Sequence, residues 1–172
     1  MGLKFAMHIA IVSERGPVTQ MKRPGAVQAS EKKRPKVLFV CYGNICRSPM
    51  AAGLARKRFG ERVEAASAGM AAAGGPASDD AVLVMKIIYQ TDISGHEARN
   101  ITDFDLRSFD YVIAMDFPIY SRLRDLRVIP EDKLYGWDIE DPLGRGYDAF
   151  KETARKIDRR LEQFAAKTGL EA

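Results

Sequence analysis

Short apolar runs alternate with longer amphipathic stretches along the chain from Lys36 onwards. Four runs of five or six residues predict short β-strands, over 36–40, 62–67, 111–115 and 133–137. The first and third runs are almost entirely apolar, which is typical of strands buried on both faces of a sheet. The stretches between the runs predict helices over 49–59, 79–90, 117–126 and 147–167, with a shorter helix over 103–109.

The ends of the predicted helices carry residues that commonly start and stop helices. The Ser48 hydroxyl is expected to cap the helix over 49–59, with Pro49 at its first position and Gly60 at its end. Ser78 is expected to cap the next helix, whose first residues are acidic. The last helix carries one apolar stripe, made of Phe150, Ala154, Ile157, Leu161 and Phe164. Such a stripe is typical of core packing.

The order of the elements predicts the fold class. Strands that alternate with helices favour an α/β fold, here a three-layer sandwich with a short parallel sheet of about four strands flanked by helices. Sites in such folds lie at the carboxyl ends of the strands. Cys41 directly follows the first strand and Asp116 directly follows the third. We therefore expect the loop between the first strand and the first helix to form the site.

Residues 1–35 form a segment of different composition, which we interpret as a basic N-terminal extension that is poorly ordered. This segment has seven Lys/Arg and two Asp/Glu, whereas residues 36–172 have 20 and 21. The formal net charge of +4 therefore arises in the extension and not in the domain over 36–172. Its apolar run is short and contains His8, so it is a poor signal peptide. Because the domain lacks a basic excess, the sequence argues against a nucleic-acid partner.

Composition narrows the class of protein further. The chain has 172 residues and is 46% hydrophobic and 29% charged, as expected for a globular protein. No window approaches the roughly 20 apolar residues of a membrane span. Its two cysteines cannot form a disulfide framework, and their spacing without a His pair is a poor zinc signature. These features favour a cytoplasmic, reducing location and no metal site.

The segment from Cys41 to Ser48 has the properties of a phosphate-binding loop. Gly43 is free in its backbone angles and Asn44 tolerates the left-handed region, so the loop can turn its N–H groups inward. The following helix directs its positive end at the same point. Arg47 adds a planar guanidinium that binds two phosphate oxygens at once. We expect the loop residues to hold the phosphate: Tyr42, Gly43, Asn44, Ile45, Cys46, Arg47 and Ser48.

Cys41 lies at the base of this loop and is the candidate nucleophile. Cysteines at helix N-termini and beside cations ionise more readily than free thiols, so a thiolate is expected. Ser48 is placed to donate a hydrogen bond to the sulfur. Asp141, which precedes Pro142, is the candidate general acid for the leaving oxygen. Gly144 and Gly146 would let its loop fold over the site.

The segment VCYGNICRSPMA resembles the phosphate loop of the low-molecular-weight protein tyrosine phosphatases. The resemblance extends from about Lys36 to Phe164 and includes SAG at 67–69, GHEARNIT around His96, FDYVIAMD ending at Asp116, and the Asp-Pro pair at Asp141. It implies that Cys41 is the nucleophile, Arg47 the phosphate-binding arginine and Asp141 the general acid. It also implies that Asn44, Ser48, Ser67 and His96 support the loop.

The resemblance implies a metal-independent phosphatase without cofactors that hydrolyses phosphotyrosine through a cysteinyl-phosphate intermediate. Its partners would be tyrosine-phosphorylated proteins, with a cognate tyrosine kinase as an open possibility, and the chain would be a monomer or weak dimer. Cys46 would be the redox partner that forms a disulfide with the oxidised nucleophile. The family often has an aromatic residue directly after Asp-Pro. Here Leu143 and Gly144 follow, so Tyr42 would supply an aromatic wall instead.

Three alternatives stay open at this point. Phosphoarginine-directed members resemble this loop with a threonine at the place of Ile45, so Ile45 argues against that substrate. A non-catalytic module that binds phosphate or phosphopeptides would need neither Ser48 nor Asp141. A redox enzyme using Cys41 and Cys46 lacks the Cys-x-x-Cys spacing. Arsenate reductases on this scaffold use further cysteines downstream, and none follows Cys46.

Overall fold

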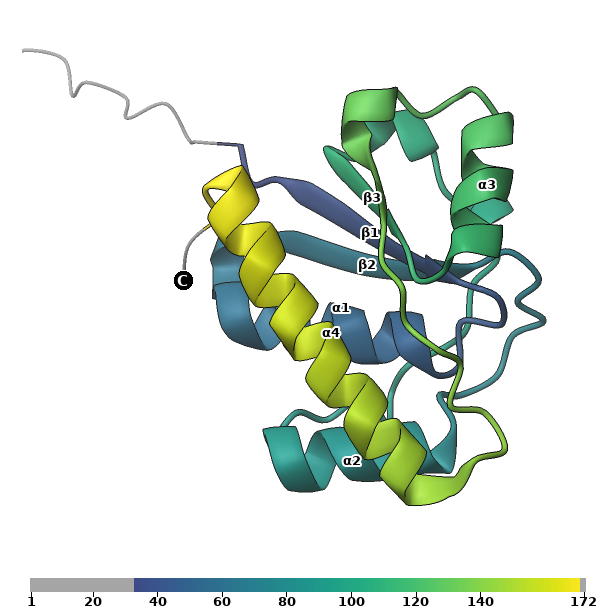
Figure 1. The fold of residues 1–172 in the computed structure, drawn as a ribbon, viewed down its shortest axis with the longest axis vertical. Helices are drawn as coiled ribbons and strands as arrows, with labels where there is room; N and C mark the ends of the chain where they lie inside the picture. Colours follow the sequence, from purple (N-terminus) through teal and green to yellow (C-terminus); the bar gives the residue numbers. More distant parts are fainter. Residues whose placement is uncertain (1–32, 171–172) are drawn as a thin grey trace, which may run out of the picture. The chain divides into compact units, whose positions relative to one another are not determined.

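The computed structural model describes residues 33–170 (Figure 1). Its strands are β1 (Lys36–Cys41), β2 (Glu64–Gly69), β3 (Tyr111–Ala114) and β4 (Leu134–Gly136). Its α-helices are α1 (Arg47–Phe59), α2 (Asp79–Tyr89), α3 (Phe117–Asp125) and α4 (Gly146–Thr168). Short 3-10 turns cover Gly60–Arg62, Ile101–Asp103, Leu106–Ser108 and Glu131–Lys133.

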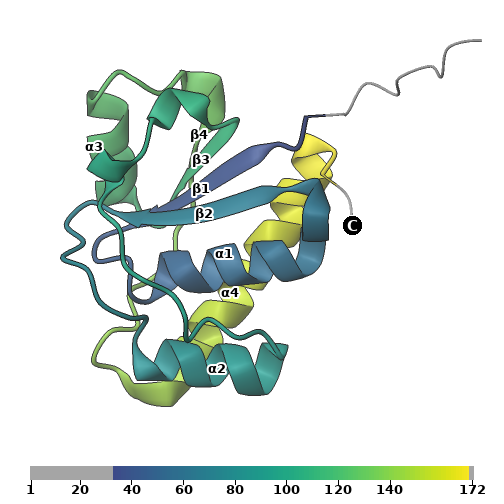
Figure 2. The ribbon, with the colours of Figure 1, turned by 180° about the vertical axis from the view of Figure 1, so that it is seen from behind.

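The four strands form one parallel sheet in the order β2-β1-β3-β4. In β1, Val37 pairs with Ala65 on one side and with Tyr111 on the other. Helices α1 and α4 cover one face, with α2 packed against these two helices on the side away from the sheet, and α3 covers the other face, as Figures 1 and 2 show. This arrangement confirms the predicted α/β sandwich with a four-stranded parallel sheet.

The core is divided into two layers by the central strand β1, whose side chains alternate between the faces of the sheet. Phe39 is fully buried against the layer that contains α1, α2 and α4. Leu38 and Val40 are fully buried in the layer beneath α3. Because both faces of β1 are covered, its carboxyl end is held rigidly, and the loop that starts at Cys41 leaves from a fixed point.

Four local predictions were wrong in detail. Ser78 lies at the N-cap position of α2, but its side chain makes no capping hydrogen bond. Helix α1 begins at Arg47 with Cys46 at the N-cap position, so Ser48 lies inside the first turn and makes no capping hydrogen bond. The segment 103–109 forms parts of two short 3-10 turns instead of one helix. Strand β2 lies two residues further along the chain than predicted, because Gly69 continues the pairing with Cys41.

The helix ends show why the remaining elements form where they do. Asp116 caps α3, since its side chain accepts a hydrogen bond from the Ile119 N–H at 2.9 Å. Gly60 and Gly169 end α1 and α4 with positive φ angles of 56° and 70°. None of the helices between residues 33 and 170 is long and apolar enough to cross a lipid bilayer. The predicted extension over 1–35 lies, up to residue 32, outside the described residues.

Candidate active site

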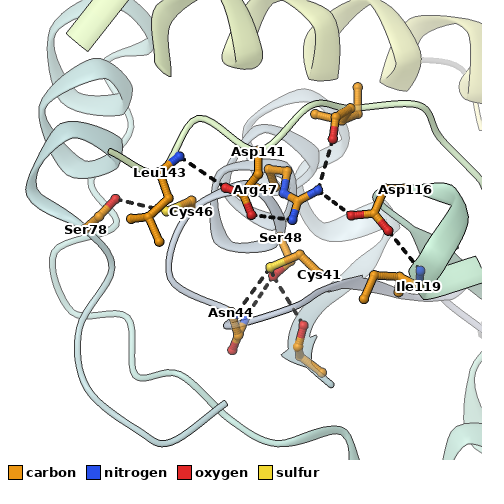
Figure 3. A network of polar contacts seen from close by, with 12 residues as sticks. Cys41, Asn44, Cys46, Arg47, Ser48, Ser78, Asp116, Ile119, Asp141 and Leu143 are labelled. Atoms are coloured by element: carbon orange, nitrogen blue, oxygen red, sulfur yellow. Dashed lines mark hydrogen bonds and ion pairs between the residues drawn. The ribbon is translucent and has the colours of Figure 1, made fainter. Parts of the chain in front are cut away.

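The loop between β1 and α1 wraps around the sulfur of Cys41 (Figure 3). Its start is fastened to the segment after β2, because the Met70 and Ala71 N–H groups donate to the Cys41 and Tyr42 carbonyls at 3.0 and 2.9 Å. Gly69 makes this approach possible. A methyl group on Gly69 would lie 2.7 Å from the Tyr42 carbonyl oxygen, which is inside van der Waals contact.

Two polar groups contact the Cys41 sulfur, which is almost fully buried at the end of β1. The Asn44 N–H donates to Sγ at 3.2 Å, and the Ser48 Oγ lies 3.0 Å from Sγ. The Asn44 amide reaches the sulfur because this residue is left-handed, with φ of 58°. Both contacts suit a sulfur that accepts hydrogen bonds.

The buried Asn44 side chain fixes the loop from inside. Its Nδ2 donates to the Ser48 Oγ at 2.8 Å, and its Oδ1 accepts from the Arg99 N–H at 2.9 Å. The Ser48 Oγ also lies 3.3 Å from the Ala68 carbonyl oxygen, which links the network to β2. Ser67, expected in this network, lies in β2, and its hydroxyl forms no hydrogen bond with residues 33–170.

His96 supports the outer side of the loop. Its Nε2 donates to the Asn44 carbonyl oxygen at 2.7 Å, which requires the proton on Nε2. Burial lowers the pKa of His96, and the hydrogen bond to Asn44 opposes this shift only in part. The imidazole is therefore neutral at pH 7, and it acts as a hydrogen-bond donor to the loop backbone.

Several loop amides have no acceptor. The N–H groups of Gly43, Ile45 and Cys46 donate to nothing in the part of the chain that the structure describes. Because backbone donors are normally paired, a run of free N–H groups around one point is typical of an anion-binding nest. The N-terminus of α1 adds its positive end at the same place.

Arg47 lies beside this nest and is 3% exposed. Its two terminal nitrogens donate to Asp116 Oδ2 at 2.6 Å and to Asp141 Oδ2 at 2.5 Å, and one of them also donates to the Ile139 carbonyl at 3.0 Å. Figure 3 shows the two carboxylates approaching the guanidinium from different sides. The Nε–H of Arg47 is buried and has no partner among residues 33–170. A buried unpaired donor on a cation is a further feature expected of an anion site.

Asp141 is held by a loop that precedes α4. Its Oδ1 accepts from the Leu143 N–H at 3.2 Å, and its side chain is 45% exposed. Gly144 and Gly146 have φ angles of 78° and 74°, so they take the backbone freedom that the sequence predicted. The structure thus places Asp141 at the mouth of the site, within reach of both solvent and the guanidinium.

Cys46 lies in the same loop but in a different environment. Burial raises the pKa of its thiol to about 11, and its Sγ lies 3.4 Å from the Ser78 Oγ. This thiol is therefore protonated at neutral pH. The structure brings Cys41, Asn44, Arg47, Ser48 and Asp141 into one site, with Cys46 on its outer side (Figure 3). His96 joins them through its contact with the loop backbone.

Sequence reasoning gave Asp116 no role beyond its position at a strand end, yet this residue holds the guanidinium of Arg47. Its position directly after β3 could have indicated this role, because sites of such folds lie at the carboxyl ends of the strands. The contacts of the Arg99 N–H with Asn44 and of the Ile139 carbonyl with Arg47 could not be predicted, because every residue has these backbone groups whatever its side chain. Residues 33–170 contain no group of three His, Cys, Asp or Glu side chains suited to hold a metal ion.

The rim of the site carries exposed apolar side chains. Tyr42, beside the nucleophile position, is 54% exposed, and Leu143, after the Asp-Pro pair, is 56% exposed. Tyr147 is partly buried and packs against the core layer that contains α4. Tyr42 is thus available as an aromatic wall, whereas Tyr147 serves mainly the core.

Comparison with known proteins identifies a matching family. The family model described as low molecular weight phosphotyrosine protein phosphatase matches residues 36–171. The protein-tyrosine-phosphatase Wzb of Salmonella typhi is 34% identical over 137 residues, covering 76% of this chain and 91% of Wzb. Arsenate reductase 2 of Staphylococcus saprophyticus is 32% identical over 129 residues, covering 74% of this chain and 94% of the reductase.

A solved structure agrees with these sequence matches. The low molecular weight protein tyrosine phosphatase from T. tengcongensis is 39% identical and superimposes with a TM-score of 0.69, covering 77% of this chain and 99% of that one. The family match thus spans the whole sheet, its helices and the loop around Cys41. This chain belongs to the low molecular weight phosphotyrosine protein phosphatase family.

Proposed function

We propose that this protein hydrolyses phosphotyrosine in other proteins, with Cys41 as nucleophile, Arg47 as phosphate ligand and Asp141 as general acid. One observation carries the proposal. The Cys41 sulfur, held by the Asn44 N–H and the Ser48 hydroxyl, lies at the base of a nest of unpaired loop amides. Such a nest suits the equatorial oxygens of a phosphoryl group, on which charge is spread in the transition state.

In the first step the Cys41 thiolate attacks phosphorus, and the bond from phosphorus to the tyrosyl oxygen breaks. Asp141 gives that oxygen its proton, so tyrosine leaves as a neutral phenol. The free Nε–H of Arg47 and the loop N–H groups bind the phosphoryl oxygens. The product of this step is a cysteinyl-phosphate.

In the second step a water molecule attacks the same phosphorus, and Asp141, now a carboxylate, accepts its proton. The sulfur–phosphorus bond breaks and the thiolate is restored. Ser48 is placed to stabilise the departing sulfur, since its Oγ lies 3.0 Å from Sγ. No metal or cofactor is required, because the cradle of amides and the guanidinium supply the positive field.

The residues also bear on the alternatives. Ile45 places an apolar side chain in the loop, partly buried against the core, where phosphoarginine-directed members resemble this loop with threonine. A binding module has no use for a carboxylate that lies on the phosphate-binding arginine at the site mouth, as Asp141 does. A thiol-relay reductase on this scaffold would use further cysteines downstream, and none follows Cys46.

The test compares two substrates that differ in leaving group. Cys41→Ser is expected to abolish hydrolysis of p-nitrophenyl phosphate and of phenyl phosphate. Asp141→Asn is expected to lower kcat for phenyl phosphate by about 10²-fold or more, and less for p-nitrophenyl phosphate, whose oxygen leaves without a proton. Asp125→Asn, an exposed carboxylate on α3, is the matched control. Retained turnover in Cys41→Ser would refute the mechanism.

We propose further that Cys46 is the redox partner of Cys41. Peroxide would oxidise the Cys41 thiolate to a sulfenic acid with loss of hydroxide. The Cys46 sulfur would then attack that sulfur, forming the disulfide and releasing water. The raised pKa of Cys46, about 11, makes this second step slow, because its thiol loses its proton reluctantly. Cys46→Ser is expected to lose more activity irreversibly under peroxide than the unchanged protein.

A cytoplasmic location and tyrosine-phosphorylated protein partners complete the proposal. Both cysteines are free thiols, and a thiolate nucleophile needs a reducing compartment to stay active. The exposed rim, with Tyr42 and Leu143, suits the aromatic ring and neighbouring residues of a phosphotyrosine in a protein. A substrate-trapping pull-down with Asp141→Ala tests these partners, since the variant keeps the phosphate cradle and loses the acid.

A further inference from the structure

The last strand of the sheet, β4, has an open edge. It pairs with β3 on one side, and within residues 33–170 no strand pairs with its other side. The Trp137 N–H donates to the Ala114 carbonyl at 2.8 Å, towards β3. Because successive residues of a strand turn their backbone groups to opposite sides, those of Gly136 and Asp138 point to the open edge. An open edge is a template for another extended chain.

This edge lies in a groove and not on a convex surface. A cavity of about 770 Å³ follows residues 134–138, so the strand itself forms its floor. Phe117 and Tyr120 of α3 line one wall, and Arg160 and Lys167 of α4 line the other. Gly136 keeps the floor low, since a methyl group there would come within 3.2 Å of the Tyr120 ring.

The groove begins where the catalytic site ends. Phe117 directly follows Asp116, whose carboxylate binds Arg47, and Asp138 directly precedes Ile139, whose carbonyl binds the same guanidinium. Phe117 is 73% exposed and stacks on Tyr120, with ring centroids 6.5 Å apart. An exposed aromatic side chain at the junction of an open strand edge and a site is typical of a recognition surface.

We propose that this groove binds the polypeptide segment that flanks the phosphotyrosine, as an extended strand paired with the open edge of β4. The proposal rests on the proposed function, because it places the substrate chain next to the site that holds its phosphate. Backbone groups of the substrate would pair with those of Gly136 and Asp138, and a side chain next to the phosphotyrosine would cover Phe117. This is strand addition to a sheet edge, with affinity from main-chain hydrogen bonds.

The floor of the groove spans residues 134–138, so it accommodates about four residues of extended chain. The experiment therefore compares three substrates: acetyl-phosphotyrosine-amide, and phosphotyrosine with four alanine-rich residues added on its N-terminal or its C-terminal side. One of the two extended peptides is expected to gain about tenfold in kcat/KM from the added main-chain hydrogen bonds. Alternate amides of that extension would face β4, and the others would face away from it. N-methylation of the amides that face β4 should remove the gain, whereas N-methylation of the other amides should keep it.

Variants of groove residues test whether the gain in kcat/KM arises from binding in the groove. Phe117→Ala and Arg160→Glu should each reduce the ratio of kcat/KM between the extended and minimal substrates by about threefold or more. Ile87→Ala, an exposed apolar residue of α2, and Arg155→Glu, an exposed arginine of α4, are the matched controls and should leave the ratio unchanged. The ratio is the readout, so any general effect of a variant on turnover cancels.

The outcomes separate the two proposals. Hydrolysis of the minimal substrate without any gain from either extension would overturn the groove proposal and leave the proposed function standing. The groove proposal would likewise fail if the gain survived N-methylation of each set of amides, or if the groove variants and the controls behaved alike. A dimer held together through β4, detected by loss of association in Arg160→Glu, would also overturn it. Absence of hydrolysis with every substrate would overturn both proposals.

Discussion

Replacement of Asn44 tests whether the loop around Cys41 is fixed by this one side chain. Asn44 is completely buried and left-handed, with φ of 58°. Asn44→Ala removes the hydrogen bonds to Ser48 and from the Arg99 N–H, each with a net value of about 1 kcal/mol. It leaves the Arg99 N–H without its acceptor, which costs about 1 kcal/mol more. A left-handed alanine adds roughly 1–2 kcal/mol of backbone strain.

Asn44→Ala should therefore lower the free energy of unfolding by about 4 kcal/mol, a large fraction of the stability of a small domain. Asn44→Gly loses the same hydrogen bonds without the strain. It should be the more stable of the two variants by about 1 kcal/mol, after allowance for the larger entropy of unfolded glycine. The comparison separates the polar network from the backbone conformation, which a single substitution cannot do.

Urea unfolding provides the measurement, followed by the fluorescence of Trp137, the one tryptophan of the chain. Trp137 is 6% exposed and packs against Phe39, so it reports loss of the core. Turnover of p-nitrophenyl phosphate should fall in both variants, because the Ser48 hydroxyl and the loop amides lose their fixed positions. The reasoning is refuted if Asn44→Ala costs less than about 1 kcal/mol, or if the glycine variant is as unstable as the alanine variant.

Three further outcomes are expected. Gly69→Ala should destabilise the domain by about 1–3 kcal/mol and abolish turnover, since the new methyl group would clash with the loop backbone. Gly95→Ala, which has open space around it, should change neither stability nor turnover, and equal effects of the two variants in urea unfolding and turnover would contradict this. Cys46, with its pKa of about 11, should resist iodoacetamide at pH 7.5 in the native protein and react once unfolded; peptide mapping that finds it alkylated in the native protein would disprove the burial argument. Because the pKa of His96 is lowered in the folded protein, the unfolded chain binds a proton at this residue more readily, and the free energy of unfolding should fall as pH drops below about 6.5. His96→Gln should flatten that part of the pH profile, and an unchanged slope would show that His96 is not responsible.

The fold was predictable because its strands are much more hydrophobic than the segments that flank them. The runs at β1 and β3 are apolar enough to demand burial on both faces, and this alone requires helices on both sides of the sheet. The four-stranded parallel sheet and the place of the loop at its carboxyl edge were confirmed. Boundaries failed where tertiary contacts decide them, as in β2, whose last residue Gly69 is fixed by pairing with Cys41.

The capping prediction for Ser48 failed for an instructive reason. Serine before a proline at a helix start satisfies every local rule for an N-cap. The hydroxyl is instead directed at the Cys41 sulfur and the Asn44 amide, two partners that the folded loop brings within 3.0 Å. A local rule weighs only backbone donors nearby in sequence. The buried sulfur and the buried amide determine where the hydroxyl points, because each of these two groups would be costly to leave without a hydrogen-bond partner.

The two carboxylates on Arg47 divide their roles by how firmly each is held. Asp116 is 24% exposed in its side chain and has its second oxygen fixed by the Ile119 N–H at the start of α3. Asp141 is 45% exposed, its second oxygen accepts from the Leu143 N–H at a longer 3.2 Å, and its loop turns at glycines. We expect a phosphate dianion that enters the nest to compete for the same guanidinium and to displace the less firmly held carboxylate. Asp116 would then keep Arg47 oriented, and Asp141 would be free at the mouth of the site to meet the leaving oxygen of the substrate.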